Sequence, residues 1–187
     1  MSKCLIMVDL QNDYFSSGIM QLVGIEDAAE NARIILTEFR KTKLPVVHIQ
    51  HISVPPNAFF FLPDTDGVKI NERVKPEEGE TVVVKNYPNS FRDTPLLEIL
   101  RNAHIDNLVI CGAMSHMCID ATVRAAFDFG FNCIVAEDAC ATMDLFFNKK
   151  LIKASEVHAS FMAALSFPYS KVVSTSDILK VIEREHR

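Results

Sequence analysis

The sequence predicts an α/β fold of three layers, in which a parallel β-sheet is covered on both faces by helices. Short apolar runs alternate along the chain with longer segments whose apolar residues recur every three or four positions, which is the pattern of strands joined by crossover helices. The apolar runs are nearly continuous, as expected for strands buried on both faces. A length of 187 residues suits one domain, so we expect residues 1–187 to form a single domain around a full core.

The predicted elements follow one another in a regular order. Strands are expected at 4–9, 45–50, 81–85, 107–113, 132–138 and 171–176, and helices at 26–43, 94–102, 117–129, 149–165 and 176–184. The first helix is amphipathic, because apolar residues from Ala29 to Phe39 are spaced three or four apart. Gly130 is typical of a helix stop and Ser176 of an N-cap.

The connection 52–80 has neither a strand pattern nor a helix pattern, and it carries four prolines and two glycines. A connection of that length inside a compact domain is usually a lid or a binding loop. We therefore interpret 52–80 as a functional loop. No internal repeat and no linker divides the chain.

The composition excludes several classes of function. Hydrophobic residues make up 49% and charged residues 23%, with a net charge of -5, which is typical of a globular protein. The 19 Lys and Arg are scattered among 24 Asp and Glu, so we expect no nucleic acid partner. The first apolar run is too short for a signal peptide, and no run reaches the roughly 20 residues that span a bilayer. We therefore expect a cytoplasmic protein without membrane contact.

The five cysteines form an odd set without a CxxC pair, which argues against a disulfide framework or a zinc knuckle. Cys4, Cys111 and Cys133 lie in apolar runs and are typical of core thiols. Cys140 fits a core or turn position. Cys118 differs, because it lies at a junction between a strand and a helix.

Three reactive side chains follow strands that should end at one edge of the sheet. Asp9 ends the first strand, Lys85 ends the third, and Cys118 opens the helix after the fourth. Ligands of an open parallel sheet bind beyond the carboxyl ends of its strands, where the strand order reverses. A cysteine at a helix N-terminus near a cation has a lowered pKa, and a neighbouring carboxylate can act as its general base. Together the three predict a nucleophilic hydrolase, although each alone also fits a loop carboxylate, an exposed strand end or a core thiol.

Four segments resemble the isochorismatase-like hydrolases, a family that includes nicotinamidases, pyrazinamidases and N-carbamoylsarcosine amidases. They are IMVDLQNDYF at 6–15, VVVKNYPNSF at 82–91, VICGAMSHMCIDATVRAAFDFGF at 109–131 and VAEDACAT at 135–142. The resemblance covers nearly the whole chain and implies a six-stranded parallel sheet of order 3-2-1-4-5-6. It also implies a catalytic triad of Asp9, Lys85 and Cys118. A non-proline cis peptide at Ala113–Met114 and an oxyanion hole from the N–H groups of Met114 and Cys118 are implied as well, and homo-oligomers are common in such a family.

The resemblance favours hydrolysis of an amide or related C–N bond of a small molecule through a thioester on Cys118. Isochorismatases proper cleave a vinyl ether and do not need the cysteine. Nicotinamidases hold a metal through an Asp-x-His segment, whereas the corresponding positions here begin at His51, so we expect no metal and no cofactor. His48 and His51 are more typical of a packed or hydrogen-bonded pair. A metal-dependent nicotinamidase, an isochorismatase-type hydrolase and a non-catalytic oligomeric binding protein are the alternatives.

Aromatic residues near these motifs are the predicted substrate contacts. They are Tyr14, Phe15, Phe59, Phe60 and Phe91, together with His116, which precedes the nucleophile by two residues. An aromatic wall suits a small substrate with an apolar face. A cover for the core or a subunit contact would explain the run Phe59-Phe60-Phe61 equally well, and His116 would either touch the substrate or stack outside the site.

Overall fold

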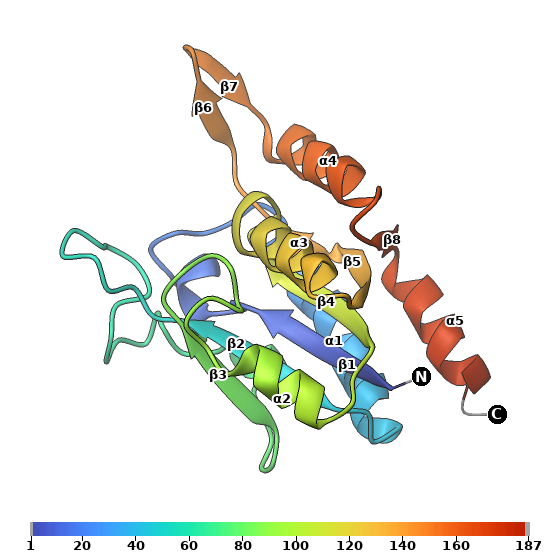
Figure 1. The fold of residues 1–187 in the computed structure, drawn as a ribbon. Coiled ribbons are helices and arrows are strands. Elements are labelled where there is room, and N and C mark those ends of the chain that lie inside the picture. The colour runs from blue at the N-terminus through green and yellow to red at the C-terminus, as the bar shows by residue number, and fades with distance from the viewer. Residues whose placement is uncertain (1, 186–187) are drawn as a thin grey trace.

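The computed structural model describes residues 2–185 and has the three-layer architecture that the sequence predicts (Figure 1). Its main sheet holds six parallel strands in the order β3-β2-β1-β4-β5-β8. The strands are β1 (Lys3–Val8), β2 (Val46–His51), β3 (Thr81–Lys85), β4 (Asn107–Ala113), β5 (Asn132–Ala141) and β8 (Lys171–Val173). The expected order 3-2-1-4-5-6 is confirmed, with β8 as the sixth strand of the sheet.

Helices cover both faces of this sheet (Figure 1). They are α1 (Ile25–Lys41), α2 (Leu96–Asn102), α3 (Asp120–Asp128), α4 (Ala154–Leu165) and α5 (Thr175–Glu185). The core on one face includes α1 and α5, and the core on the other includes α2, α3 and α4. Short turns are η1 (Asn12–Tyr14), η2 (Glu72–Val74) and the π-helical η3 (Ser115–Ile119). Within the described residues, no helix has the length and apolar character needed to cross a membrane.

Strand β1 shows how the sequence builds two cores at once. Its side chains alternate between the faces, so Leu5 and Met7 pack on the α1 side while Cys4, Ile6 and Val8 pack on the α2 and α3 side. All five are buried. Burying each large apolar side chain stabilises the fold by about 1.5–3 kcal/mol. The strand is therefore held rigidly up to the point where Asp9 follows it.

A hairpin arm replaces the first part of one predicted helix. Residues 149–153 were expected to be helical, but α4 begins at Ala154, and the preceding segment forms the antiparallel pair β6 (Leu145–Phe147) and β7 (Lys150–Ile152). This hairpin arm projects away from the body of the molecule (Figure 1). Asn148 and Lys149 at its tip have φ of 48° and 63°. Two successive residues with positive φ are what a tight type I′ hairpin turn requires, and a helix excludes them.

Two smaller expectations are corrected and one is confirmed. Strand β3 lies at the edge of the sheet, so Val82 and Val84 are 43% and 46% exposed instead of buried on both sides. The N-cap of α5 is not Ser176, which lies inside the helix; the hydroxyl of Ser174 accepts a hydrogen bond from Asp177 N at 3.3 Å. Gly130 follows α3 with φ of 88°, as a helix stop requires.

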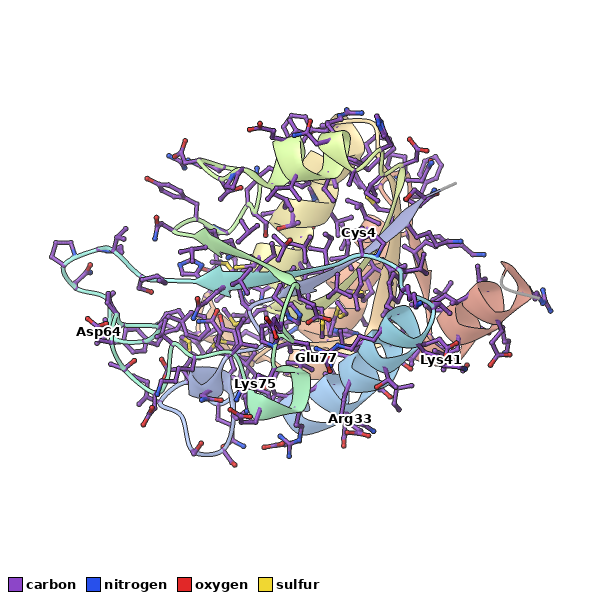
Figure 2. The ribbon with its side chains drawn as sticks, turned by 90° about the horizontal axis from the view of Figure 1, so that it is seen from below. Cys4, Arg33, Lys41, Asp64, Lys75 and Glu77 are labelled. Atoms are coloured by element: carbon purple, nitrogen blue, oxygen red, sulfur yellow. The ribbon has the colours of Figure 1, made fainter. Side chains whose placement is uncertain are left out.

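The loop 52–80 is tied to the segment that follows β1. Asn12 N donates to Lys69 O at 3.0 Å, and Asp13 N donates to Gly67 O at 2.9 Å. The carboxylate of Asp13 also accepts from Phe61 N at 2.6 Å. The loop therefore forms a fixed wall at the carboxyl edge of the sheet. Figure 2 shows Asp64 on the outer part of this loop, and it shows the charged side chains of Arg33 and Lys41 on the outside of the molecule.

Candidate active site

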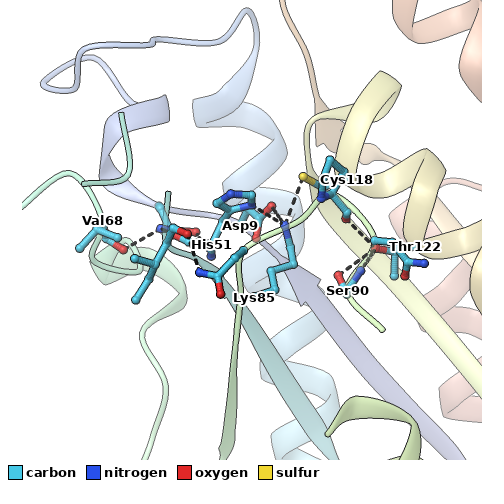
Figure 3. Close-up of polar contacts among 12 residues, drawn as sticks. Asp9, His51, Val68, Lys85, Ser90, Cys118 and Thr122 are labelled. Carbon is cyan, nitrogen blue, oxygen red and sulfur yellow. Dashed lines mark hydrogen bonds and ion pairs between the residues drawn. The ribbon is translucent and has the colours of Figure 1, made fainter. Parts of the chain in front are cut away.

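The carboxyl ends of four neighbouring strands bring together the three residues predicted to be catalytic, and they add a fourth. Lys85 ends β3, and the strand register places it beside His51 at the end of β2. Asp9 follows β1, and Cys118 lies in the η3 turn after β4. These four side chains converge in Figure 3. The topology thus gathers groups that are far apart in the sequence.

The ammonium group of Lys85 lies at the centre of the cluster. Its Nζ is 2.7 Å from Asp9 Oδ2, 2.8 Å from His51 Nδ1 and 3.3 Å from Cys118 Sγ. An ammonium has three N–H donors and no acceptor, so these contacts use all of its donors. Asp9 and Lys85 are fully buried, and Cys118 is only 4% exposed. The charges therefore interact with little screening by water.

The pKa shifts follow from this burial and pairing. Burial raises the pKa of the Cys118 thiol, the charge of Asp9 raises it further, and Lys85 only partly opposes them. Burial alone would lower the pKa of Lys85, but Asp9 and Cys118 outweigh it, so its pKa is raised. The expected lowering of the Cys118 pKa is therefore wrong. A thiolate would add a second negative charge beside Asp9, where a single ammonium is available to balance both.

Asp9 is held in an uncommon conformation with one oxygen unpaired. Its φ is 52°, in the left-handed region that Asp tolerates better than most residues. Within residues 2–185, its buried Oδ1 has no hydrogen-bond partner. A buried acceptor without a partner costs about 1–3 kcal/mol. A carboxylate oxygen of Asp9 lies within 4.8 Å of Cys118 Sγ, so this side chain can receive a proton next to the sulfur.

Two further residues belong to the site: His51, which the sequence predicted only as a packed or hydrogen-bonded partner of His48, and Gln11, which it did not single out. The buried Gln11 side chain accepts from His51 N at 2.7 Å and donates to His51 O at 2.9 Å and Val68 O at 2.7 Å. It thereby joins the end of β2 to the loop 52–80. Gln11 lies in the first family-like motif, and His51 ends a strand, but only the register shows that His51 meets Lys85.

The cluster does not suit a divalent metal. Ligand atoms of Asp9, His51 and Cys118 lie within 4.8 Å of one another, which is a possible ligand set. The same three residues, however, each bond to the ammonium of Lys85, so a cation would have to displace a positive charge from their centre. His48 is not a fourth ligand, because its Nε2 is 2.9 Å from Glu80 Oε2. No step of the chemistry below is routed through a metal.

The turn that carries Cys118 is held by its neighbours. The Ala113–Met114 peptide bond is cis. Ser115 Oγ lies 2.9 Å from His158 Nδ1 on α4 and donates to Ala141 O at 3.3 Å. His158 belongs to α4 and Ala141 is the last residue of β5, so two other elements anchor the η3 turn. They fix the backbone of Met114 through Cys118, whose N–H groups are the predicted oxyanion donors.

The aromatic residues divide between the site and the core. Tyr14 packs against Phe60 and Phe61, with ring centroids 6.1 and 4.6 Å apart, and Phe61 lies 5.9 Å from the ring of His51. Burial raises the pKa of Tyr14, and the charges of Cys118 and Asp9 raise it further, so its phenol stays protonated beside these two residues. These rings form an aromatic wall, defined here as Tyr14, Phe60 and Phe61.

Phe15 and Phe91, expected to contact substrate, are instead core side chains. Phe15 is buried near the guanidinium of Arg73. Phe91 packs 5.2 Å from the ring of Phe129, at the opposite end of the α3 segment from Cys118.

The two remaining predicted contacts lie at the rim. Phe59 is 57% exposed and continues the aromatic run outward, with its ring centroid 5.2 Å from that of Phe60. His116 Nδ1 is 2.6 Å from Thr142 Oγ1, and its ring lies edge-on to Phe161. A substrate contact for either residue stays a prediction.

Comparison with known proteins identifies the family. The isochorismatase domain matches residues 3–166. An uncharacterized isochorismatase family protein of Bacillus subtilis, YddQ, is 50% identical and covers 96% of this chain and 100% of its own. The secreted isochorismatase effector Isc1 of Verticillium dahliae is 32% identical over 93% of this chain and 88% of its own. A crystal structure of an isochorismatase hydrolase-type protein from Oleispira antarctica has a TM-score of 0.92 at 50% identity and covers 96% of both chains. The chain belongs to the isochorismatase family of hydrolases.

Proposed function

We propose that this protein is a cysteine hydrolase that cleaves the amide or a related C–N bond of a small molecule through a thioester on Cys118. The observation that carries the proposal is the position of the Lys85 ammonium, which lies 2.7 Å from Asp9 Oδ2 and 3.3 Å from Cys118 Sγ in the buried interior. A nucleophile, a general base and a cation are thereby held within one set of hydrogen bonds.

The resting state that this geometry favours has a protonated Cys118 thiol beside an ionised pair of Asp9 and Lys85. The raised pKa values of the thiol and of the ammonium support this distribution of charge. The thiolate then forms only when its proton moves to Asp9. The negative charge is exchanged between carboxylate and sulfur, while Lys85 stays bonded to both and its charge balances either form.

The reaction follows from that exchange. Asp9 takes the Sγ proton as the sulfur attacks the carbonyl carbon, and the N–H groups of Met114 and Cys118 stabilise the oxyanion. Asp9 then gives the proton to the nitrogen, the C–N bond breaks, and ammonia or an amine leaves. A water molecule attacks the thioester and loses a proton to Asp9. Release of the acid returns that proton to the Cys118 sulfur.

Relatives with named reactions support C–N bond cleavage. A streptothricin hydrolase of Streptomyces noursei is 33% identical over 76% of this chain and 56% of its own. The ureidoacrylate amidohydrolase RutB of Klebsiella pneumoniae is 26% identical over 73% of this chain and 72% of its own. Nicotinamidase 3 of Arabidopsis thaliana is 26% identical over 84% of this chain and 80% of its own. The last two names specify cleavage of an amide-type C–N bond, and the first specifies a hydrolase.

The test is ammonia release from a panel of small amides and ureides by the wild-type protein and by Cys118→Ala. We expect the variant to lose activity by at least about 1,000-fold, because removal of a nucleophile abolishes the covalent route. Cys133→Ala removes a different buried thiol and should keep most of the activity. Unchanged turnover by Cys118→Ala contradicts the proposal and would favour the thiol-independent chemistry of isochorismatases proper.

A further inference from the structure

Building on the proposed function, we infer that His51 contacts the substrate and selects it. Its imidazole donates a hydrogen bond from Nε2 to an acceptor atom beside the scissile amide. The site then takes small amides or ureides that carry a second acceptor, such as a carbonyl oxygen or a ring nitrogen, next to the reacting carbonyl.

The backbone of His51 is fixed at the edge of the site. His51 is the last residue of β2, and the fully buried Gln11 bonds to both its N–H and its carbonyl oxygen, at 2.7 and 2.9 Å. The strand register places it next to Lys85. The imidazole ring is therefore attached to a backbone that is held in place by the sheet and by Gln11.

The contact with Lys85 determines the tautomer of the ring. Lys85 Nζ lies 2.8 Å from His51 Nδ1, and an ammonium can only donate. Nδ1 is therefore the acceptor, and the proton of the neutral ring lies on Nε2. Burial, followed by the charge of Lys85, lowers the pKa of His51 to about 4 against a smaller opposing effect of Asp9, so the ring is neutral at pH 7.

The Nε2 donor has no protein acceptor within residues 2–185, where the only side-chain hydrogen bond of His51 is the one to Lys85. A ring nitrogen of His51 lies within 4.8 Å of Cys118 Sγ. The ring also borders the aromatic wall, at 5.9 Å from Phe61. A substrate bound at the sulfur thus lies beside the imidazole ring and the aromatic wall, and Nε2 is the ring nitrogen left to bond to it.

This arrangement predicts specificity. A donor on a fixed backbone in a half-buried site must be satisfied by the bound substrate, because solvent is displaced when the substrate enters. An analogue that lacks the acceptor leaves the donor unpaired and is rejected. Matched pairs of amides, which differ in one acceptor atom but not in shape, therefore reveal the contact.

Two substitutions separate substrate contact from support of Lys85. His51→Asn places an amide near Nδ1, so it keeps an acceptor for Lys85 but has no donor at the position of Nε2. His51→Gln reaches the position of Nε2, so it keeps that donor but loses the acceptor at Nδ1. His104→Asn is the matched control, because His104 is exposed and follows α2 outside the site.

The measurement is kcat/KM for ammonia release from the three pyridinecarboxamides against benzamide, and from acetoacetamide against 3-methylbutanamide. For the wild-type protein and for His104→Asn, kcat/KM should be higher for an amide with the second acceptor than for its partner without it. His51→Asn should lower the ratio of kcat/KM between that member and its partner by about 10- to 100-fold, while His51→Gln keeps the ratio.

The results that overturn the inference are distinct from those that overturn the function. A wild-type protein without preference, an equal loss for both members of a pair in His51→Asn, or a preference kept by Asn and lost by Gln contradicts the role of His51 while the hydrolase stands. A wild-type protein that releases no ammonia from any amide or ureide contradicts both.

Discussion

At the scale of single residues, the central feature is a lysine whose charge serves three acceptors. Lys85 bonds to Asp9, His51 and Cys118, so a change at any one of them alters the charge balance of the others. Because Asp9 raises the pKa of Cys118 and Lys85 lowers it, the two neighbours of the sulfur act in opposite directions. The reactivity of the thiol and the rate of hydrolysis should therefore respond differently to substitution.

Substitution of Asp9 separates these two properties. With its pKa raised, Cys118 of the wild-type protein should react slowly with iodoacetamide at pH 7, and the rate should increase only above the pH at which a free thiol, with a pKa of about 8.5, ionises. Asp9→Asn removes the negative charge and keeps Lys85, so the pKa of Cys118 falls and alkylation at pH 7 accelerates, although hydrolysis is lost. The measurement is the alkylation rate of the Cys118 peptide against pH. A variant whose pH profile stays at or above that of the wild type contradicts this charge balance.

The sequence predicted the identities of the three clustered residues but not all of their surroundings. Asp9, Lys85 and Cys118 could be found because each lies at or just after the end of a strand, in a segment that resembles the isochorismatase-like hydrolases. The contacts of His51 and Gln11 could not be predicted, since they depend on the register between β2 and β3 and on a loop that returns over the site. The sign of the Cys118 pKa shift was also missed, because a helix N-terminus and a cation matter less than full burial beside a carboxylate.

At the scale of elements, the close approach of β4 to β1 holds the site together. Gly112 pairs with Val8, immediately before Asp9, and its φ is 126°. A Cβ at this position would lie 2.0 Å from Val8 O, which is backbone and cannot rotate away. Only glycine lets the two strands that carry Asp9 and the Cys118 turn lie this close.

Substitution of Gly112 should therefore be costly. We expect Gly112→Ala to lower the free energy of unfolding by at least about 3 kcal/mol, because it adds a clash to the strain of a positive φ. Gly130→Ala is the control, since its φ is 88° but nothing lies within 4 Å of the added Cβ, and it should lose only about 1–2 kcal/mol. Urea unfolding measures both, and equal losses would show that the approach of the strands is not the constraint.

The sequence predicted the long elements better than the short ones. All six strands of the sheet and the five helices were located, because they continue a regular alternation of apolar runs and helical patterns, although the last strand was expected at 171–176 and ends at Val173. The hairpin arm was missed, since its strands have three residues each and its turn reads Asn148-Lys149 without the glycine that usually marks a tight hairpin. Similarly, the edge position of β3 cannot be inferred from an apolar run alone.

At the scale of the whole molecule, the hairpin arm exposes large apolar side chains. Phe146 is 72% exposed and Phe147 67% exposed. A two-stranded hairpin is at best marginally stable alone, and exposed apolar patches commonly mark interfaces. The expected homo-oligomer stays a prediction, and the arm is the surface on which it is best tested.

The corresponding experiment is light scattering on the wild-type protein and on Phe146→Ser/Phe147→Ser. We expect the wild type to be a homo-oligomer and the double variant to form a smaller species, because the apolar contact is removed. Phe167→Ser is the control, since Phe167 is 84% exposed outside the arm. A monomeric wild type, or a double variant of unchanged mass, contradicts the prediction.

The most direct test of the account is to intercept the acyl group on Cys118 with hydroxylamine during turnover of an amide that the wild-type protein hydrolyses. Hydroxylamine attacks a thioester to form a hydroxamate and regenerate the thiol, so hydroxamate should accumulate together with ammonia. Cys118→Ala should produce neither. Ammonia released by the wild-type protein with no hydroxamate at any hydroxylamine concentration would contradict the thioester, and with it the assignment of Cys118 as the nucleophile.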